Sequence, residues 1–267
     1  MGEYKANTMR SASALRCQIE VTLAGRIPSA LTPAAKTIRE VMPTGIAAVD
    51  AMLDGGLPVG AVTEMIGAEC SGRTALALSF VAQVTKAERV CAWIDVLDAL
   101  SPESAAASGI ELRRLLWVRC GVRSTTIRMT KPWSRIEQAL RVTDLLLQGG
   151  GFSALVLDLG SIAPEHVSRI PLATWFRYGV AAERSRTSVL LLTQHACSKS
   201  SAGLVLRLQA GSHLDGESTV LAGLERRVEV SRQRFTDAPA KVVPLRKPPQ
   251  RATSADWRSK TAWTGVR

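Results

Sequence analysis

The sequence predicts an α/β protein with a mostly parallel β-sheet that is covered by helices on both faces and followed by a basic, flexible C-terminal tail. Two observations indicate this class. Short, continuous apolar runs, such as those within Ala154–Leu159 before Asp158 and within Ser188–Thr193, are typical of strands buried on both faces of a sheet. They alternate with longer stretches that have apolar residues at helical spacing, and this alternation is typical of parallel sheets with helices on both sides.

The first predicted strand of the core is Ala61–Ile66. A helix is predicted at Arg73–Lys86, because apolar residues recur there at the spacing that gives a helix one buried side. The next two strands are predicted at Val90–Asp95 and Leu115–Arg119. Strand, helix and strand thus follow one another as a parallel sheet requires.

The second half of the core has two predicted helices. Arg135–Leu147 ends before Gly149–Gly151, a strong signal for a helix end, and Pro171–Arg186 precedes the apolar strand Ser188–Thr193. A strand-rich part then follows, with strands predicted at Gly203–Gln209, Val220–Leu224 and Val228–Arg232.

The chain of 267 residues is long enough for one large domain with short extensions. We expect a lead over residues 1–40 with one short helix near Ser11–Leu23, a core over 41–244, and a tail over 245–267. The tail has Pro248, Pro249 and many cations but little apolar periodicity, so it is predicted to be flexible.

The net charge of +11 is concentrated near the C-terminus. From Glu225 to Arg267 there are eleven Lys and Arg against four Asp and Glu. A basic end favours contact with nucleic acid or with an acidic partner surface. A solvated, solubilising tail explains the same charge, and the sequence leaves both interpretations open.

The five cysteines are scattered and form no C-x-x-C pair, which favours a reducing compartment and argues against a zinc site. The N-terminus has no apolar signal core. No apolar run approaches the roughly 20 residues that a membrane helix needs. We therefore expect a cytoplasmic protein without a membrane partner.

The clearest motif follows the first core strand and opens the first core helix. It consists of Gly67, Ala68, Glu69, Cys70, Ser71, Gly72, Arg73 and Thr74. Strand, glycine-rich loop and helix are the context of a Walker A loop, whose backbone N–H groups turn toward phosphate oxygens. ATP is the expected ligand, and Thr74 offers a hydroxyl for Mg²⁺.

Arg73 stands where such a loop usually has lysine. Its guanidinium keeps the charge, but it is a wide, planar fork and not a point-charge ammonium. The sequence leaves two outcomes open, a loop that still binds nucleotide and a loop that only caps a helix.

Several further stretches, in order and spacing, resemble the RecA recombinase family over roughly residues 40–240. They are Pro43–Asp50, Gly55–Gly60 and Ile94–Pro102. The resemblance implies a RecA-like P-loop core in which Asp158 helps to hold Mg²⁺ and Gln194 senses the γ-phosphate. It also implies that Arg232 and Arg234 match two basic residues that reach ATP across a subunit interface.

The chain departs from that family at the expected catalytic base. The position of the glutamate that activates water is Leu97, which accepts no proton, so base catalysis is lost unless Asp98 serves. No catalytic residue is therefore assigned. The stretches after Asp158 and Gln194 are also shorter than the DNA-contacting loops of recombinases, so strand exchange by this chain alone is not expected.

Four stretches resemble the ImuA family of bacterial mutagenesis proteins more closely. They are Ile27–Leu31, Gly67–Thr74 with its Arg, Glu111–Cys120 and Thr174–Gln194. This resemblance implies an accessory role in SOS-induced, error-prone repair by translesion synthesis. It implies RecA and a Y-family-like polymerase homologue of the ImuB type as partners, with DNA contact through the basic C-terminal region. Two alternatives are an active DNA-dependent ATPase of the recombinase type and a regulator resembling cell-division inhibitors.

Overall fold

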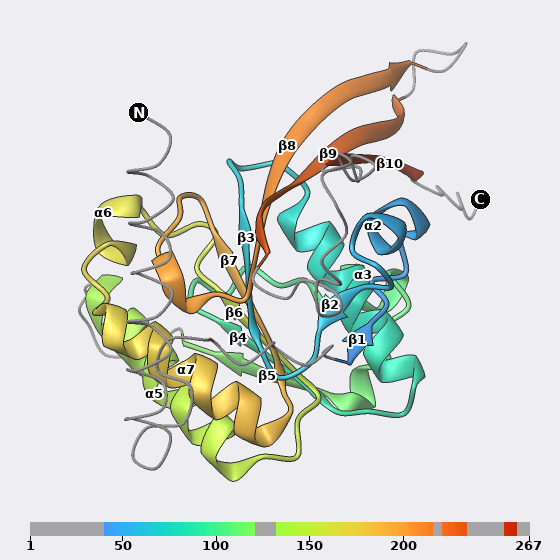
Figure 1. Ribbon diagram of the computed structural model, residues 1–267. Helices are drawn as coiled ribbons and strands as arrows, with labels where there is room; N and C mark the ends of the chain where they lie inside the picture. Colours follow the sequence, from blue (N-terminus) through green and yellow to red (C-terminus); the bar gives the residue numbers. More distant parts are fainter. Residues whose placement is uncertain (1–39, 121–131, 216–220, 234–253, 261–267) are drawn as a thin grey trace, which may run out of the picture. The chain divides into compact units, whose positions relative to one another are not determined.

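The computed structural model describes residues 40–120, 132–215, 221–233 and 254–260, and a central sheet organises them (Figure 1). Its strands are β3 (Val62–Ile66), β4 (Cys91–Asp95), β5 (Leu115–Arg119), β6 (Ala154–Asp158), β7 (Ser188–Thr193), β8 (Leu204–Asp215), β9 (Leu221–Gln233) and β10 (Ser254–Lys260). The strand order is β10-β9-β8-β3-β7-β6-β4-β5. The six strands from β8 to β5 run parallel, and β9 and β10 are added antiparallel at the β8 edge.

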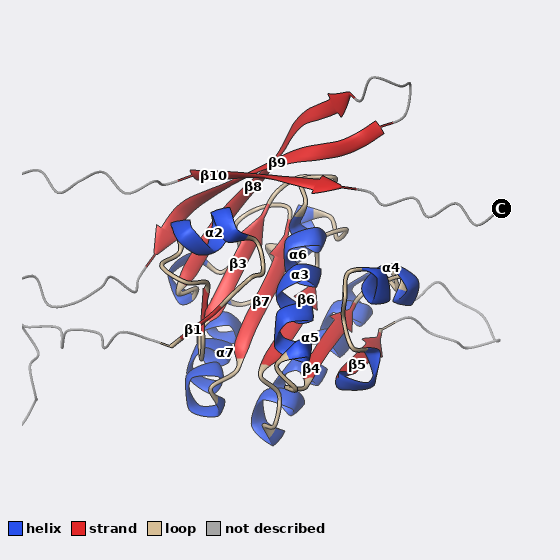
Figure 2. Ribbon diagram, turned by 90° about the vertical axis from the view of Figure 1, so that its right-hand side faces the viewer, coloured by secondary structure: helices blue, strands red, loops and turns tan. Residues whose placement is uncertain are grey.

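Helices cover both faces of this sheet (Figure 2). They are α2 (Ala47–Met52), α3 (Arg73–Lys86), α4 (Pro102–Ala107), α5 (Pro132–Gly149), α6 (Pro164–Val167) and α7 (Leu172–Ser185). The core on the α3 side contains Phe80 and Trp93, and the core on the other side contains Ile136 of α5 and Trp175 of α7. The predicted α/β class, with a mostly parallel sheet between two helical layers, is thereby confirmed.

Most departures from the predicted elements are short or lie at the ends. The helices α2, α4 and α6 and the small antiparallel sheet of β1 (Val41–Met42) and β2 (Leu57–Pro58) were not predicted. Two strands predicted within residues 220–232 are one strand, β9. The helix predicted near Ser11–Leu23 lies outside the described residues.

One part of the tail that is predicted to be flexible is a strand. Ser254–Lys260 form β10, which pairs antiparallel with Gly223–Glu229 of β9. The backbone ladder needs no apolar pattern, so apolar periodicity did not reveal this strand. The rest of the predicted tail lies outside the described residues. None of the helices within the described ranges is long and apolar enough to cross a membrane.

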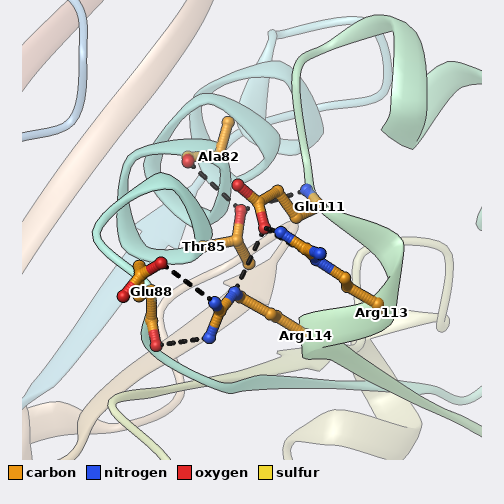
Figure 3. Close-up of polar contacts among 6 residues, drawn as sticks. All are labelled: Ala82, Thr85, Glu88, Glu111, Arg113 and Arg114. Atoms are coloured by element: carbon orange, nitrogen blue, oxygen red, sulfur yellow. Dashed lines mark hydrogen bonds and ion pairs between the residues drawn. The ribbon is translucent and has the colours of Figure 1, made fainter.

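The C-terminal end of α3 is tied to the edge strand β5 by a polar cluster (Figure 3). The Glu111 carboxylate accepts hydrogen bonds from Arg113 Nη2 at 3.0 Å and Arg114 Nε at 3.1 Å. These bonds lower the pKa of Glu111. Arg114 Nη1 donates to the carbonyl of Glu88 at 2.7 Å, and the Glu111 N–H donates to Thr85 Oγ1 at 3.2 Å. The cluster fixes the turn that leads into β5.

A buried carboxylate anchors the segment that follows β7. Glu64, in the middle of β3, is 1% exposed. Its Oε1 accepts the N–H groups of Cys197 at 2.7 Å and of Ser198 at 3.3 Å, and its Oε2 accepts the Ser198 hydroxyl. Burial, with a further contribution from Glu64, raises the pKa of the Cys197 thiol. The chain beyond β7 is therefore held against the β3 strand.

We predict that Glu64→Gln lowers the free energy of unfolding by about 1–3 kcal/mol. The amide keeps one acceptor oxygen but places a donor against the N–H and O–H groups that Glu64 now binds. Urea denaturation measures the change. The matched control is Glu165→Gln, at an exposed position, which we expect to change stability by less than about 0.5 kcal/mol. Equal stabilities of wild type and Glu64→Gln would contradict the anchoring role.

Candidate nucleotide-binding site

The loop Gly67–Thr74 connects the end of β3 to the start of α3. The Gly67 N–H donates to the carbonyl of Thr193, at the end of β7, at 3.1 Å. Gly72 is the N-cap of α3 with φ +93°, in the left-handed region that favours glycine. Thr74 lies exposed in the first turn of α3. The loop therefore presents a helix N-terminus and a hydroxyl at the same edge of the sheet.

Around this loop, buried polar side-chain atoms lack partners among the described residues. They are Ser71 Oγ, Arg73 Nη1 and Thr193 Oγ1. Their residues are 2%, 7% and 0% exposed. Unpaired buried polar groups are costly, so such a cluster indicates a ligand or water at the site. A group rich in acceptor oxygens, such as a phosphate, fits the donors of this set.

Arg73 is directed toward the end of β6. Its Nη2 donates to the carbonyl oxygen of Gly160 at 3.1 Å, and Gln194 Nε2 donates to the same oxygen at 3.0 Å. Burial lowers the pKa of Arg73, whereas the charges of Asp158 and Glu69 raise it. One arm of the guanidinium is thus engaged within the protein, and the other arm is the unpaired Nη1.

Asp158 ends β6 beside this arginine. Its Oδ1 accepts the N–H of Gly160 at 2.9 Å. Burial raises the pKa of Asp158, and the charge of Asp95 on the neighbouring strand adds to this, while the Gly160 bond and Arg73 act in the opposite direction. Asp158 and the hydroxyl of Thr74 are oxygen donors of the type that Mg²⁺ prefers. No cluster of three or more His, Cys, Asp or Glu able to hold a metal occurs in the described part of the chain.

At the position of the expected catalytic base, the sequence has an apolar residue and the structure places it against the apolar core. Leu97 is half-buried and packs against the core on the α5 and α7 side. The alternative base, Asp98, has φ +63° and forms a two-pronged ion pair with Arg119 at the end of β5. This pairing raises the pKa of Arg119. Asp98 therefore points toward the β5 edge, away from the phosphate loop after β3.

The two basic residues assigned to a subunit interface differ in what the structure shows. Arg232 Nη2 donates to the carbonyl oxygens of Lys199 and, at 3.2 Å, of Ala202, both in its own chain. Arg234 lies outside the described residues. Arg232 is thus held along β9 by the segment after β7.

A cavity that the sequence did not reveal lies next to Gln194. It has a volume of about 290 Å³ and is lined by residues from 162–168, after β6, and from 194–197, after β7. Its walls are formed by two segments that are distant in sequence and meet only because β6 and β7 are neighbours. Neither segment alone has a sequence pattern that would predict this cavity.

The fold and the loop together define a RecA-like P-loop protein. Residues 18–167 match the RecA N-terminal domain family. The chain therefore belongs to the RecA family. Among curated proteins, it is 38% identical to Protein RecA of Brucella anthropi over 120 residues, which is 45% of this chain and 30% of that protein.

A mitochondrial DNA repair protein recA homolog of Dictyostelium discoideum is 40% identical over 120 residues, covering 45% of this chain and 24% of that protein. The match thus spans less than a third of either curated relative. Among solved structures, the RadB recombinase superposes with a TM-score of 0.55 at 19% identity, covering 82% of this chain and 96% of that one. This last likeness supports the fold.

We predict that Asp158→Asn raises the melting temperature of the ligand-free protein at pH 7. A carboxyl group whose pKa is raised in the folded state favours folding fully at low pH, and it loses that contribution as pH rises through its folded pKa. The amide is never ionised, so the gain over wild type should vanish below about pH 4. The control, Asp144→Asn, removes the ion pair with Arg177 and should not raise the melting temperature. A stability of Asp158→Asn below that of wild type at pH 7 would count against this account.

Proposed function

We propose that this RecA-family protein binds nucleotide and acts as an accessory factor in SOS-induced, error-prone DNA repair, with little or no ATP hydrolysis. The observation that carries the proposal is Leu97, which fills the position of the expected base and packs into the core. Asp98, the alternative base, is engaged by Arg119. The phosphate loop meanwhile keeps its glycines, its helix N-terminus and Thr74. The loop that would bind phosphate is thus kept, whereas the position of the expected base is apolar, and this difference supports binding without turnover.

Each loop element has a distinct task in this proposal. Backbone N–H groups between Gly67 and Arg73 would bind phosphate oxygens at the positive end of α3. Thr74 and Asp158 would hold Mg²⁺, which neutralises phosphate charge when bound. Gln194 would connect the phosphate end of the site with the segment after β7 through the shared Gly160 carbonyl. These tasks need no proton transfer.

Partners are proposed from the resemblance to the ImuA family and from charge. We infer contacts with RecA and with a Y-family-like polymerase homologue in the cytoplasm. The excess of cations after Glu225 suits the acidic surface of a protein partner or DNA. A nucleotide-bound RecA fold without turnover would act there as an adaptor.

A second candidate function is a DNA-dependent ATPase of the recombinase type. It is favoured by the family membership and by the curated relatives, which carry the name RecA. It requires Asp98 to leave Arg119 and approach the nucleotide. A turnover measurement separates the two candidates.

We predict that the protein binds ATP but hydrolyses it far more slowly than about 1 s⁻¹, a rate typical of the lower range for enzymes, with or without single-stranded DNA. Leu97→Glu should raise any residual rate, because it restores a proton acceptor. Phosphate release measures both, and Leu112→Glu, at an exposed site on another turn, is the control. DNA-stimulated turnover at enzyme rates by the wild type would favour the recombinase-type function instead.

We also predict that reversing both Arg232 and Arg234 to Glu abolishes capture of RecA in a pull-down. Like charges placed against an interface cost several kcal/mol. Arg227→Glu is the control, because that exposed residue pairs with Glu229 on its own strand. Circular dichroism must show native folding of each variant, since Arg232 has bonds within its chain. Equal capture by wild type and the double variant would reject a docking role for this pair.

A further inference from the structure

The hairpin of β8 and β9 contacts the phosphate loop at both of its ends. A Cβ atom built on Gly67 would lie 2.6 Å from the carbonyl oxygen of Leu208 on β8. A Cβ atom built on Gly72 would lie 2.8 Å from Cδ and 3.0 Å from Nε of Arg226 on β9. A side chain at Gly67 would meet backbone, and a side chain at Gly72 would displace Arg226. The hairpin therefore lies against the loop within the same chain.

Arg226 is buried at the positive end of α3. The residue is only 9% exposed, and its side chain lies against Gly72, the N-cap of this 14-residue helix. A cation at a helix N-terminus lies beside the positive end of the helix dipole, so an anion at this point would be attracted by both. The position of Arg226 suits an anion that contacts both the guanidinium and the N–H groups at the start of α3.

The neighbouring donors give independent support for such an anion. Ser71 Oγ and Arg73 Nη1 are buried without a partner among the described residues. Arg73 is held at its other arm by Gly160, so it offers the site only part of its fork. A second cation at the loop would supply further N–H donors and positive charge for phosphate oxygens, which Arg73 offers only in part.

We propose that Arg226 is a phosphate-binding residue that the β8–β9 hairpin supplies to the nucleotide site of its own chain. The ligand class is the polyphosphate of a nucleotide, and the inference rests on the proposed nucleotide binding. Arg226 binds phosphate oxygens from above Gly72, opposite the backbone N–H groups of the loop. It acts in binding alone and takes no part in a chemical step.

The strand itself provides a matched control. Arg226 and Arg227 are neighbours on β9, and successive side chains point to opposite faces of a strand. Arg227 is exposed and pairs with Glu229 at 3.2 Å. Replacing either arginine by glutamine removes one positive charge from the same stretch of chain. A difference between the two variants therefore reports position and not net charge.

The experiment is titration of the full chain with a fluorescent ATP analogue and Mg²⁺, comparing wild type with Arg226→Gln, Arg226→Lys and Arg227→Gln. We expect Arg226→Gln to weaken binding by about 10- to 100-fold, the range for hydrogen bonds to charged groups. Arg226→Lys should recover part of that loss, because it keeps the cation. Arg227→Gln should bind like wild type. Melting curves without ligand check that each variant is folded.

The outcomes separate the inference from the proposed function. Absence of binding by folded wild type would overturn nucleotide binding and the role of Arg226 together. Binding by wild type with equal affinity in Arg226→Gln would overturn the role of Arg226 alone. Equal weakening in Arg226→Gln and Arg227→Gln would do the same, since it would reflect general charge. If Arg226→Gln is unfolded, folded Arg226→Lys decides the question. Weaker binding in Arg226→Lys than in wild type and Arg227→Gln supports the inference, and affinity equal to wild type rejects it.

Discussion

The carbonyl oxygen of Gly160 accepts hydrogen bonds from both Arg73 and Gln194, and the geometry of the site depends on this shared acceptor. It joins the segments that follow β3, β6 and β7, which come together only at the carboxyl edge of the parallel sheet. The bond from Arg73 uses Nη2, one of the two terminal nitrogens of its guanidinium. The ammonium group of a lysine is a compact point charge, so it would contact this carbonyl and the loop in a different geometry from the planar guanidinium.

Binding and hydrolysis depend on different parts of this fold. The loop, the helix N-terminus and the oxygen donors lie after β3 and β6, whereas water activation in the RecA family would depend on the segment after β4. At the end of β4, Asp95 is buried and accepts the N–H groups of Ala99 and Leu100, in the segment that follows, at 3.0 and 2.8 Å. These bonds hold the turn that contains Leu97, and they involve no residue of the phosphate loop.

Sequence patterns predicted the elements that are long or wholly apolar. The bounds of α3 and β7 are those expected, because burial on one helical side or on both faces of a strand leaves a clear pattern. The bounds of the edge strand β5 are also those expected, although its residues are only partly buried or exposed. The direction of Arg73 and the pairing of Asp98 with Arg119 were not predictable. Both depend on residues distant in sequence that strand order brings near. β9 was predicted as two strands because charged residues around Arg226 interrupt its apolar pattern, and that interruption marks the residue that contacts the phosphate loop.

The contact between the β8–β9 hairpin and the loop has a consequence for assembly. An intramolecular group has an effective concentration that is set by the chain, not by how much protein is present. The end of the loop beneath Arg226 is therefore completed in a dilute, solitary molecule. In a filament in which the neighbouring subunit completes each nucleotide site, nucleotide binding depends on assembly. If Arg226 binds phosphate as proposed, nucleotide binding and assembly are uncoupled at this end of the site, and the chain would bind nucleotide before it meets any other protein.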